Sequence, residues 1–162
     1  LGVDAVWLTS IYPTNDVDFG YDITDMKNIY KLLDNGTVFD ELVKKLHQEG
    51  IKLILDFVPN HTSNKHDWFL KSIGTEKYRN YYVWRAGSKD TITGTIKPPN
   101  NWAAAIGGGS AWTYDSFRKE FYLHQFLEEE PDLNYENEDV IKDMTDVLDF
   151  WLNKGVDGFR MA

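Results

Sequence analysis

Three polar side chains accompany the end of an apolar run in the segment IKLILDFVPNH, residues 51–61. Asp56 stands inside that run, and Asn60 and His61 follow where a strand would end. In parallel α/β folds, ligands and catalytic groups lie at the carboxyl ends of strands. A buried carboxylate also needs partners, because an isolated charge is costly in an apolar setting. The pattern therefore favours a functional site over a polar turn that merely follows a core strand.

A second cluster, DFGYD at residues 18–22, follows the first apolar run of the chain. Gly20 relaxes the backbone, which allows two acids, Asp18 and Asp22, to project near one spot with Tyr21. Solvated acids in an ordinary turn would have the same pattern, so the two interpretations stand at even odds on this segment alone.

Two more clusters occur later in the chain. EEEPDLN at residues 128–134 contains Glu130, and a run of acids is also typical of a solvated face. The last cluster is DGFRMA at residues 157–162. Alternate residues of a strand share a face, so Arg160 and Ala162 are expected to point the same way.

Composition limits the classes of function. The 162 residues carry a net charge of −9, which argues against nucleic acid or an anionic membrane surface as a partner. Aromatic residues make up 15% of the chain, including six Trp, and aromatic faces can stack on sugars. There is no Cys, and no apolar run has the length of a membrane span.

The elements that must position these clusters alternate between strand and helix. We expect strands at 3–8, 51–58 and 156–160 and helices at 37–49 and 137–154, the order of a parallel sheet with crossovers. Residues 62–136 far exceed a connection of roughly 2–6 residues. This stretch holds four of the six Trp and strand-like pieces at 81–84 and 121–126, which predicts an inserted subdomain. The chain starts and stops at strands, so we interpret it as an internal piece of a longer protein.

In this order, the clusters resemble the glycoside hydrolase family that contains α-amylases and α-glucosidases. DFVPNH is similar to the first signature of that family, and GFRM to the start of its second. DFGYDI and PDLN resemble its maltase and oligosaccharide α-glucosidase branch. The segments YYVW, PPNNW, SAW and YLHQF are similar to insect maltases in particular, so the resemblance covers essentially the whole chain.

The resemblance implies an α/β fold, a partial (β/α)8 TIM barrel. The chain would hold strands 2 to 4, with an inserted B domain after strand 3. Residues 1–61 and 137–162 would then be barrel parts and residues 62–136 the inserted domain. A complete barrel needs about 250 residues, so the chain would be roughly a third to a half of the enzyme.

The resemblance also implies roles for individual residues. Asp56 would orient Arg160, which would sit beside the nucleophile. Asn60 matches a calcium ligand of α-amylases, although no cofactor is certain. The terminal glucose would be bound by Asp18, Tyr21, His61, Phe126, Glu130 and Arg160.

Two positions depart from the family pattern. The nucleophilic Asp is expected two residues after the arginine, where this chain has Ala162, whose methyl group cannot attack an anomeric carbon. Glu130 stands where the branch usually has Gln, which adds a negative charge near the pocket. No complete catalytic set is therefore expected in this chain, and the fragment by itself should be inactive.

The implied parent is a retaining α-glucosidase, or maltase, that releases terminal α-linked glucose from maltose, sucrose or short oligosaccharides. The alternative is a catalytically inactive relative, acting as a binding protein or as a subunit like an amino-acid transporter heavy chain. Ala162 and Glu130 favour the alternative, whereas an intact sugar clamp favours the enzyme. The resemblance implies a secreted or cell-surface location, with any membrane attachment through parts outside this chain.

Overall fold

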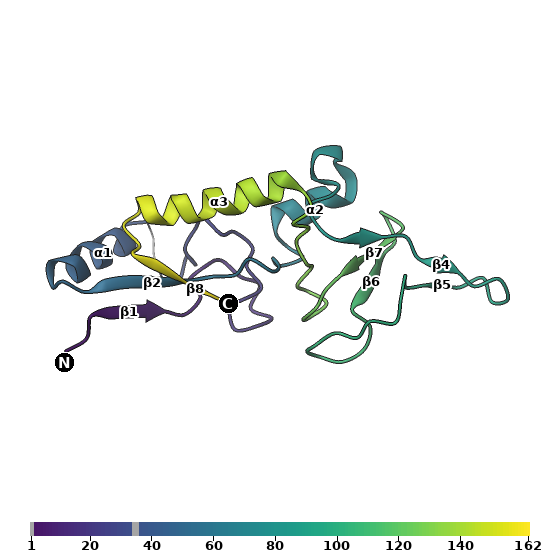
Figure 1. Ribbon diagram of the computed structural model, residues 1–162, viewed down its shortest axis with the longest axis horizontal. Coiled ribbons are helices and arrows are strands. Elements are labelled where there is room, and N and C mark those ends of the chain that lie inside the picture. The colour runs from purple at the N-terminus through teal and green to yellow at the C-terminus, as the bar shows by residue number, and fades with distance from the viewer. Residues whose placement is uncertain (1, 34–35) are drawn as a thin grey trace. The chain divides into compact units, whose positions relative to one another are not determined.

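The computed structural model describes residues 2–33 and 36–162, and Figure 1 shows its elements. The chain divides into two compact units. The first comprises the described residues up to Pro59 together with Ile141–Ala162, and the second comprises Asn60–Val140. Each unit has a sheet of its own.

The sheet of the first unit consists of β1 (Ala5–Leu8), β2 (Lys52–Phe57) and β8 (Gly158–Met161), in the order β1-β2-β8. Both pairings are parallel. The central strand β2 carries the most apolar sequence, and its residues Leu53 and Leu55 are completely buried. The predicted parallel α/β arrangement is confirmed, and the carboxyl ends of the three strands meet at one edge.

Two helices accompany this sheet, α1 (Val38–Gln48) and α3 (Glu138–Asn153). Trp151 of α3 is buried and packs edge to face against Phe39 of α1, with 5.3 Å between the ring centroids. Gly155 ends the α3 segment with φ +90°, and a Cβ there would lie 2.8 Å from Val43 Cγ1. Glycine therefore permits both the left-handed turn and the close approach to α1.

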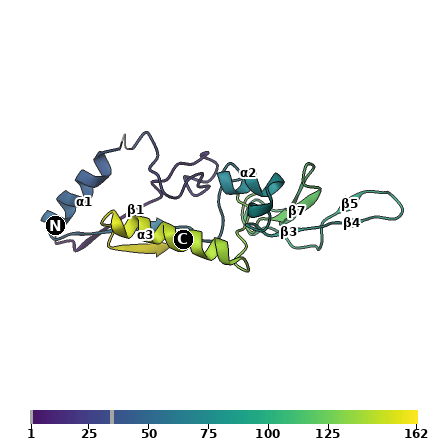
Figure 2. The same cartoon turned by 90° about the horizontal axis from the view of Figure 1, so that it is seen from above.

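The second unit is built around a small antiparallel sheet with the strand order β3-β7-β6. Its core is aromatic: Phe69 stacks on Trp84 at 5.5 Å and meets Tyr122 edge to face at 5.1 Å. A second ribbon, β4 with β5, projects as a hairpin in Figure 2. The elements of this unit are α2 (Asp67–Gly74), the 3-10 helix η1 (Glu76–Tyr78), β3 (Trp84–Arg85), β4 (Ser88–Lys89), β5 (Ile96–Lys97), β6 (Trp112–Asp115) and β7 (Glu120–Leu123).

The predictions differ in accuracy between the two units. The expected strands and helices of the first unit are found within about three residues of their predicted ends. In the second unit, β3 and β7 overlap the predicted pieces, but α2 was not predicted. This helix has only eight residues, and its N-cap is His66, whose Nδ1 accepts from Trp68 N at 3.1 Å. Histidine is not among the usual N-cap residues, so no capping signal announces the helix.

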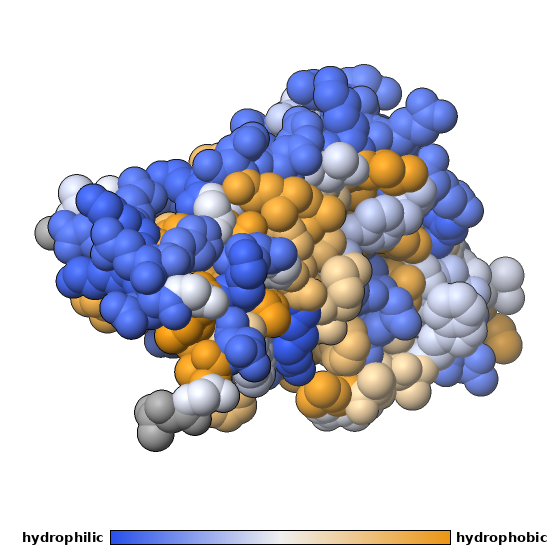
Figure 3. All heavy atoms as spheres, turned by 60° about the vertical axis from the view of Figure 1, so that its left-hand side comes forward, coloured by the Kyte–Doolittle hydropathy of each residue, from blue (hydrophilic) through white to orange (hydrophobic). Residues whose placement is uncertain are grey.

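Several large apolar side chains of the first unit are exposed, including Val3, Trp7 and Met161. Figure 3 shows apolar surface on the side that it presents. Parallel sheets are normally covered on both faces, and β1 and β8 are the edges of this one.

Asp157 links three elements of the first unit. Its Oδ2 accepts from Leu53 N at 2.9 Å and lies 2.8 Å from His47 Nε2, and its Oδ1 lies 3.2 Å from Lys52 Nζ. The hydrogen bond from the Leu53 amide is the largest of the effects that lower the pKa of Asp157 to about 2. One carboxylate thus joins α1 and β2 to the segment that leads into β8.

We expect Asp157→Asn to destabilise the protein by about 1 kcal/mol at pH 7, because a charge-assisted hydrogen bond becomes a neutral one. The folded-state pKa lies below the unfolded value, so this stabilisation is present above about pH 4 and is lost as the pH falls towards 2. Thermal unfolding of parent and variant from pH 7 to pH 2 measures the difference. Asp146→Asn, an equal charge change on the exposed side of α3, is the control; an equal loss there would contradict the assignment.

Candidate functional site

Asp56, near the carboxyl end of β2, is the central acceptor of a polar cluster in the first unit. The residue is 1% exposed. Its Oδ1 accepts from Trp7 Nε1 at 2.7 Å and from Arg160 Nη1 at 3.0 Å, and its Oδ2 accepts from the Tyr21 hydroxyl at 2.7 Å. We call these four residues the Asp56 cluster. They come from β1, the loop that follows β1, β2 and β8, so four segments converge on one carboxylate.

The register of the sheet explains how the Asp56 cluster forms. Asp56 pairs with Arg160 across β2 and β8, and Trp7 pairs with Ile54 across β1 and β2. The guanidinium of Arg160 lies 4.6 Å above the centroid of the Trp7 ring. The hydrogen bond to Asp56 raises the pKa of Arg160, and its side chain is 48% exposed. A fixed cation is thus presented at the carboxyl end of the sheet.

Tyr21 combines a bound hydroxyl with a partly exposed ring. Burial raises the pKa of its hydroxyl, and the hydrogen bond to Asp56 raises it further. The hydroxyl therefore stays protonated and donates to the carboxylate. Because that group is engaged, the ring face is what Tyr21 can offer to a ligand.

A completely buried acid, Asp22, shapes the loop that carries Asp18 and Tyr21. Tyr21 N also donates to Asp18 O at 2.8 Å, and Gly20 has φ +96°, as the expected turn requires. Because Asp22 is buried, the DFGYD segment is not an ordinary turn of solvated acids. Asp22 accepts hydrogen bonds from Thr14 Oγ1 (2.5 Å), Asn15 N (3.1 Å), Val17 N (3.2 Å) and Asp18 N (3.4 Å).

In the second unit, His61 lies between an amide and a carboxylate. Its Nδ1 is 3.2 Å from Asn60 Nδ2, and its Nε2 is 3.3 Å from Glu130 Oε1. The ring also meets Phe126 edge to face at 5.4 Å. With the Asn60 amino group facing Nδ1, the imidazole proton belongs on Nε2, towards Glu130. Glu130 is completely buried, and its Oε2 accepts from Leu127 N at 3.1 Å.

Asp132 forms a second buried carboxylate in this unit. Its Oδ1 accepts from Asn60 Nδ2 at 3.2 Å, and its Oδ2 accepts from Gln125 Nε2 at 2.5 Å. Burial raises the pKa of Asp132, while the hydrogen bonds from Gln125 and Asn60 act in the opposite direction. Asn60 Oδ1 accepts from Gln125 Nε2 at 3.3 Å as well.

These contacts bear on the calcium expectation for Asn60. Ca²⁺ takes six to eight oxygen ligands, but the oxygens of Asn60 and Asp132 are already engaged by Gln125. Within residues 2–33 and 36–162, no group of three or more His, Cys, Asp or Glu side chains could hold a metal ion. A role of Asn60 as a calcium ligand therefore stays a prediction.

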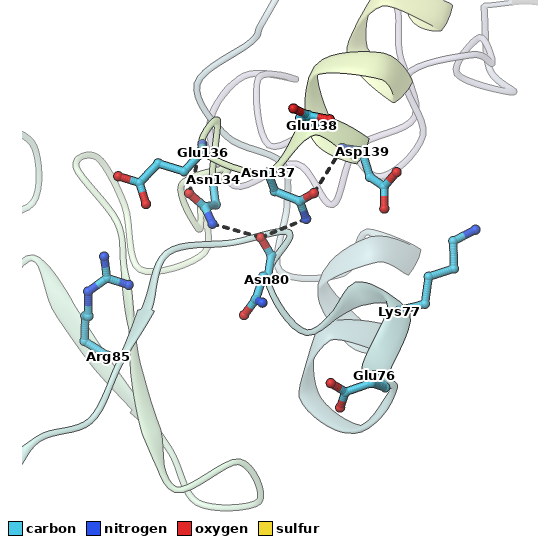
Figure 4. Close-up of a pocket in the computed structure, with 9 residues that line it drawn as sticks. All are labelled: Glu76, Lys77, Asn80, Arg85, Asn134, Glu136, Asn137, Glu138 and Asp139. Carbon is cyan, nitrogen blue, oxygen red and sulfur yellow. Dashed lines mark hydrogen bonds between the residues drawn. The ribbon is translucent and has the colours of Figure 1, made fainter.

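The second unit also has an open polar hollow of about 730 Å³. Asn134 and Asn137 each donate to Asn80 O there, at 3.0 and 3.2 Å (Figure 4). Asn137 Oδ1 in turn accepts from Asp139 N at 3.0 Å in the first turn of α3. These hydrogen bonds therefore cap helix α3, and the hollow is lined by both acidic and basic side chains. Its lining consists of Glu76, Lys77, Asn80, Arg85, Asn134, Glu136, Asn137, Glu138 and Asp139.

The residues predicted as site residues form two groups. The first unit holds Asp18, Tyr21, Asp56 and Arg160, with Ala162 at the end of β8, where its backbone N donates to Phe57 O at 2.9 Å. The second holds Asn60, His61, Phe126 and Glu130. Sequence reasoning missed Trp7 and Asp132 as partners of these groups, and Asp22, expected to project beside Asp18, is instead buried and accepts hydrogen bonds from its own loop. Asp22 and Asp132 lie within the motifs DFGYD and PDLN, so the motifs were identified from the sequence, but the partners of these two acids were not.

Comparison with known proteins identifies the family. The profile described as "Alpha amylase, catalytic domain" matches residues 1–162. The chain belongs to the α-amylase catalytic-domain family. An alpha-glucosidase from Apis mellifera is 48% identical over 162 residues, covering 99% of this chain and 28% of that protein. The family resemblance expected from the sequence is confirmed.

Other relatives and a solved structure agree with this family. A salivary alpha-glucosidase from Anopheles gambiae is 46% identical over 99% of this chain and 27% of that protein. The amino acid transporter heavy chain SLC3A1 from Homo sapiens is 43% identical over 99% of this chain and 23% of that protein. An isomaltulose synthase from Erwinia rhapontici NX5, solved with D-glucose, superposes with a TM-score of 0.91 at 40% identity, covering 99% of this chain and 28% of that one. The chain thus spans about a quarter of the length of these proteins.

We expect Asp22→Asn to lower the free energy of unfolding by about 2 kcal/mol, because the amide cannot accept from all four donors that the carboxylate serves. Asp16→Asn is the matched control, since it removes the same charge from an exposed position of the same loop and should change stability by less than about 0.5 kcal/mol. Chemical denaturation of the full-length protein measures both. Equal effects at the two positions would show that Asp22 does not shape the loop.

Proposed function

We propose that the chain is part of a retaining α-glucosidase of the maltase type. With a carboxylate at position 162, such an enzyme would release terminal α-linked glucose from maltose, sucrose and short oligosaccharides. The proposal is supported by the α-glucosidases among its relatives and by the polar clusters described above. The observation that carries it is the Asp56 cluster, which gathers a tyrosine ring and an arginine at the carboxyl ends of parallel strands.

The fold supports the same proposal at a finer level. We propose that β1, β2 and β8 are strands 2, 3 and 4 of a (β/α)8 barrel. The open edges of the sheet and its exposed apolar side chains are what further barrel strands would cover. Residues 62–136, proposed as the inserted B domain, fall within the second compact unit, Asn60–Val140.

In the first unit, the residues proposed to bind the terminal glucose are Asp18 and Tyr21. A carboxylate such as Asp18 can accept two neighbouring sugar hydroxyls, and the ring of Tyr21 can stack on the apolar face of the sugar. In the second unit, His61 and Phe126 are the residues proposed to contact glucose. His61 would donate a hydrogen bond to a sugar hydroxyl from Nε2, which lies 3.3 Å from Glu130 Oε1.

Chemistry with retention needs a carboxylate nucleophile and a general acid. By the family pattern the nucleophile belongs at position 162, on the strand face of Arg160, where the cation would stabilise the attacking carboxylate. Ala162 supplies no such group. The chain as it stands would therefore bind the sugar without forming a glycosyl-enzyme, and the general acid would come from a later strand.

The test of this proposal is the full-length protein with and without a carboxylate at position 162. We expect Ala162→Asp to raise the rate of maltose hydrolysis by a factor of about 10³ or more over the protein with Ala162. Ala162→Asn, of nearly equal size, is the control and should stay inactive. Glucose release is followed by a coupled assay. Turnover by the Ala162 protein would contradict the role of this position, and an inactive Ala162→Asp variant that binds maltose would favour the binding-protein alternative.

The grip on glucose can be tested without turnover. In the full-length protein with Ala162, we expect Tyr21→Ala to weaken maltose binding at least about tenfold because the stacking face is lost. Tyr21→Phe keeps the face and loses only the hydroxyl that Asp56 holds, so the dissociation constant should change less than about threefold. Isothermal titration calorimetry measures both. If the Phe variant binds as poorly as the Ala variant, the ring does not carry the contact.

The relationship to SLC3A1 keeps a second candidate function open, a non-catalytic subunit of an amino-acid transporter. Ala162 is the observation that favours it, because such a subunit needs no nucleophile. In the described part of the chain, no helix is both long and apolar enough to cross a membrane. With a salivary α-glucosidase among the relatives, we propose that the parent protein is secreted or displayed at the cell surface.

A further inference from the structure

Trp102, in the second unit, is 58% exposed and packs against a buried ring. Its ring stacks on that of Trp112 with 6.2 Å between the centroids and 27° between the planes. The backbone carbonyl oxygen of Trp102 accepts from Ala111 N at 2.8 Å, and its backbone N donates to Asn100 Oδ1 at 3.1 Å. The backbone of Trp102 is thus held by hydrogen bonds, and its exposed ring packs on that of Trp112.

The loop after Trp102 explains this placement. Residues 103–110 fold back as a short hairpin, in which Ala103 and Ser110 form an antiparallel bridge. Gly107, Gly108 and Gly109 all have φ between +74° and +84°, so the return is made in the left-handed region that favours glycine. The returning chain delivers Trp112 beside Trp102.

Two asparagine side chains border the ring. The carbonyl oxygen of the Asn100 side chain accepts from Trp102 N and from Trp112 Nε1 at 2.8 Å. These bonds engage only the oxygen, so the amino group of Asn100 can donate to a ligand. Asn101 is exposed and offers both a donor and an acceptor. An aromatic face bordered by amides is the combination that binds the apolar face and the hydroxyls of a sugar ring.

Charge also favours a neutral ligand. The residues around Trp102 line a hollow of about 490 Å³, which lies within the range of ligand sites. Lys97 is the one charged residue among those that line it, and its Nζ lies 2.6 Å from Asp90 Oδ2. Its charge is already balanced, so an anionic ligand has little to gain here. The remaining lining residues are Ser88, Pro98, Asn100, Asn101, Ala103, Gly109 and Ser110.

We propose that the Trp102 ring and the amides of Asn100 and Asn101 form a binding platform for an α-glucan, separate in its contacts from the residues that grip a terminal glucose. The geometry selects a neutral sugar ring, and the choice of α-linked glucose rests on the proposed function. Because a platform contacts the face of a ring, it needs no chain end. It would hold an oligosaccharide by inner glucose units.

The test uses β-cyclodextrin, a closed ring of α-linked glucose without a chain end, on the full-length protein. A pocket that grips a terminal glucose cannot take this ligand, so its binding reports on the platform and is independent of maltose hydrolysis. We expect saturable binding below about 10 mM in calorimetry, weakened at least about tenfold by Trp102→Ala. Phe117→Ala, which removes a ring that is 87% exposed on the same unit, is the control and should leave binding unchanged.

A second measurement guards against misfolding of the Trp102→Ala variant. The protein is labelled with 5-fluorotryptophan, and Trp102→Phe identifies the Trp102 resonance by its loss. That resonance should shift with β-cyclodextrin along the same saturation curve as the heat of binding. Absence of binding up to about 10 mM, an unmoved Trp102 resonance, or equal losses in Trp102→Ala and Phe117→Ala would each overturn the proposal.

Discussion

The need to neutralise one buried carboxylate governs the first unit. Asp56 lies near the carboxyl end of the central strand β2 with 1% exposure, so its charge must be met by donors within the protein. The donors come from Trp7 on β1, Tyr21 in the following loop and Arg160 on β8. A shift of one residue in either strand pairing would turn these side chains to the opposite face. The carboxylate therefore fixes the register of the sheet and the position of the cation together.

The second unit also contains buried polar side chains that are held by hydrogen bonds. His61 and Asp132 are buried, and each is held by neighbours that are themselves fixed by hydrogen bonds. Glu130 replaces the amide that the maltase branch usually carries, and it places a carboxylate 3.3 Å from His61 Nε2. Buried polar groups of this kind are costly unless their hydrogen bonds are satisfied.

The sequence predicted these two units unequally. The parallel strands and the helices α1 and α3 were predicted well, because long apolar periodicity and glycine stops are local signals. Helix α2 and the ribbon of β4 and β5 were missed, since short elements with unusual caps carry little local information. Among site residues, Asp56, Arg160 and His61 could be predicted from motif and position. Trp7 and Asp22 could not, because their role consists of a contact with residues distant along the chain or with a folded loop.

The sequence alone determined the family, the parallel α/β class, the side chains available for chemistry and the missing carboxylate at Ala162, because these depend on residue identity and on spacing along the chain. Only the tertiary structure decided which acid serves which partner. Asp56 binds Arg160, Asp22 accepts hydrogen bonds within the loop of Asp18, and the exposed ring of Trp102 packs on that of Trp112. Each of these depends on strand register or on a returning loop, and such long-range contacts have no signature in the local sequence.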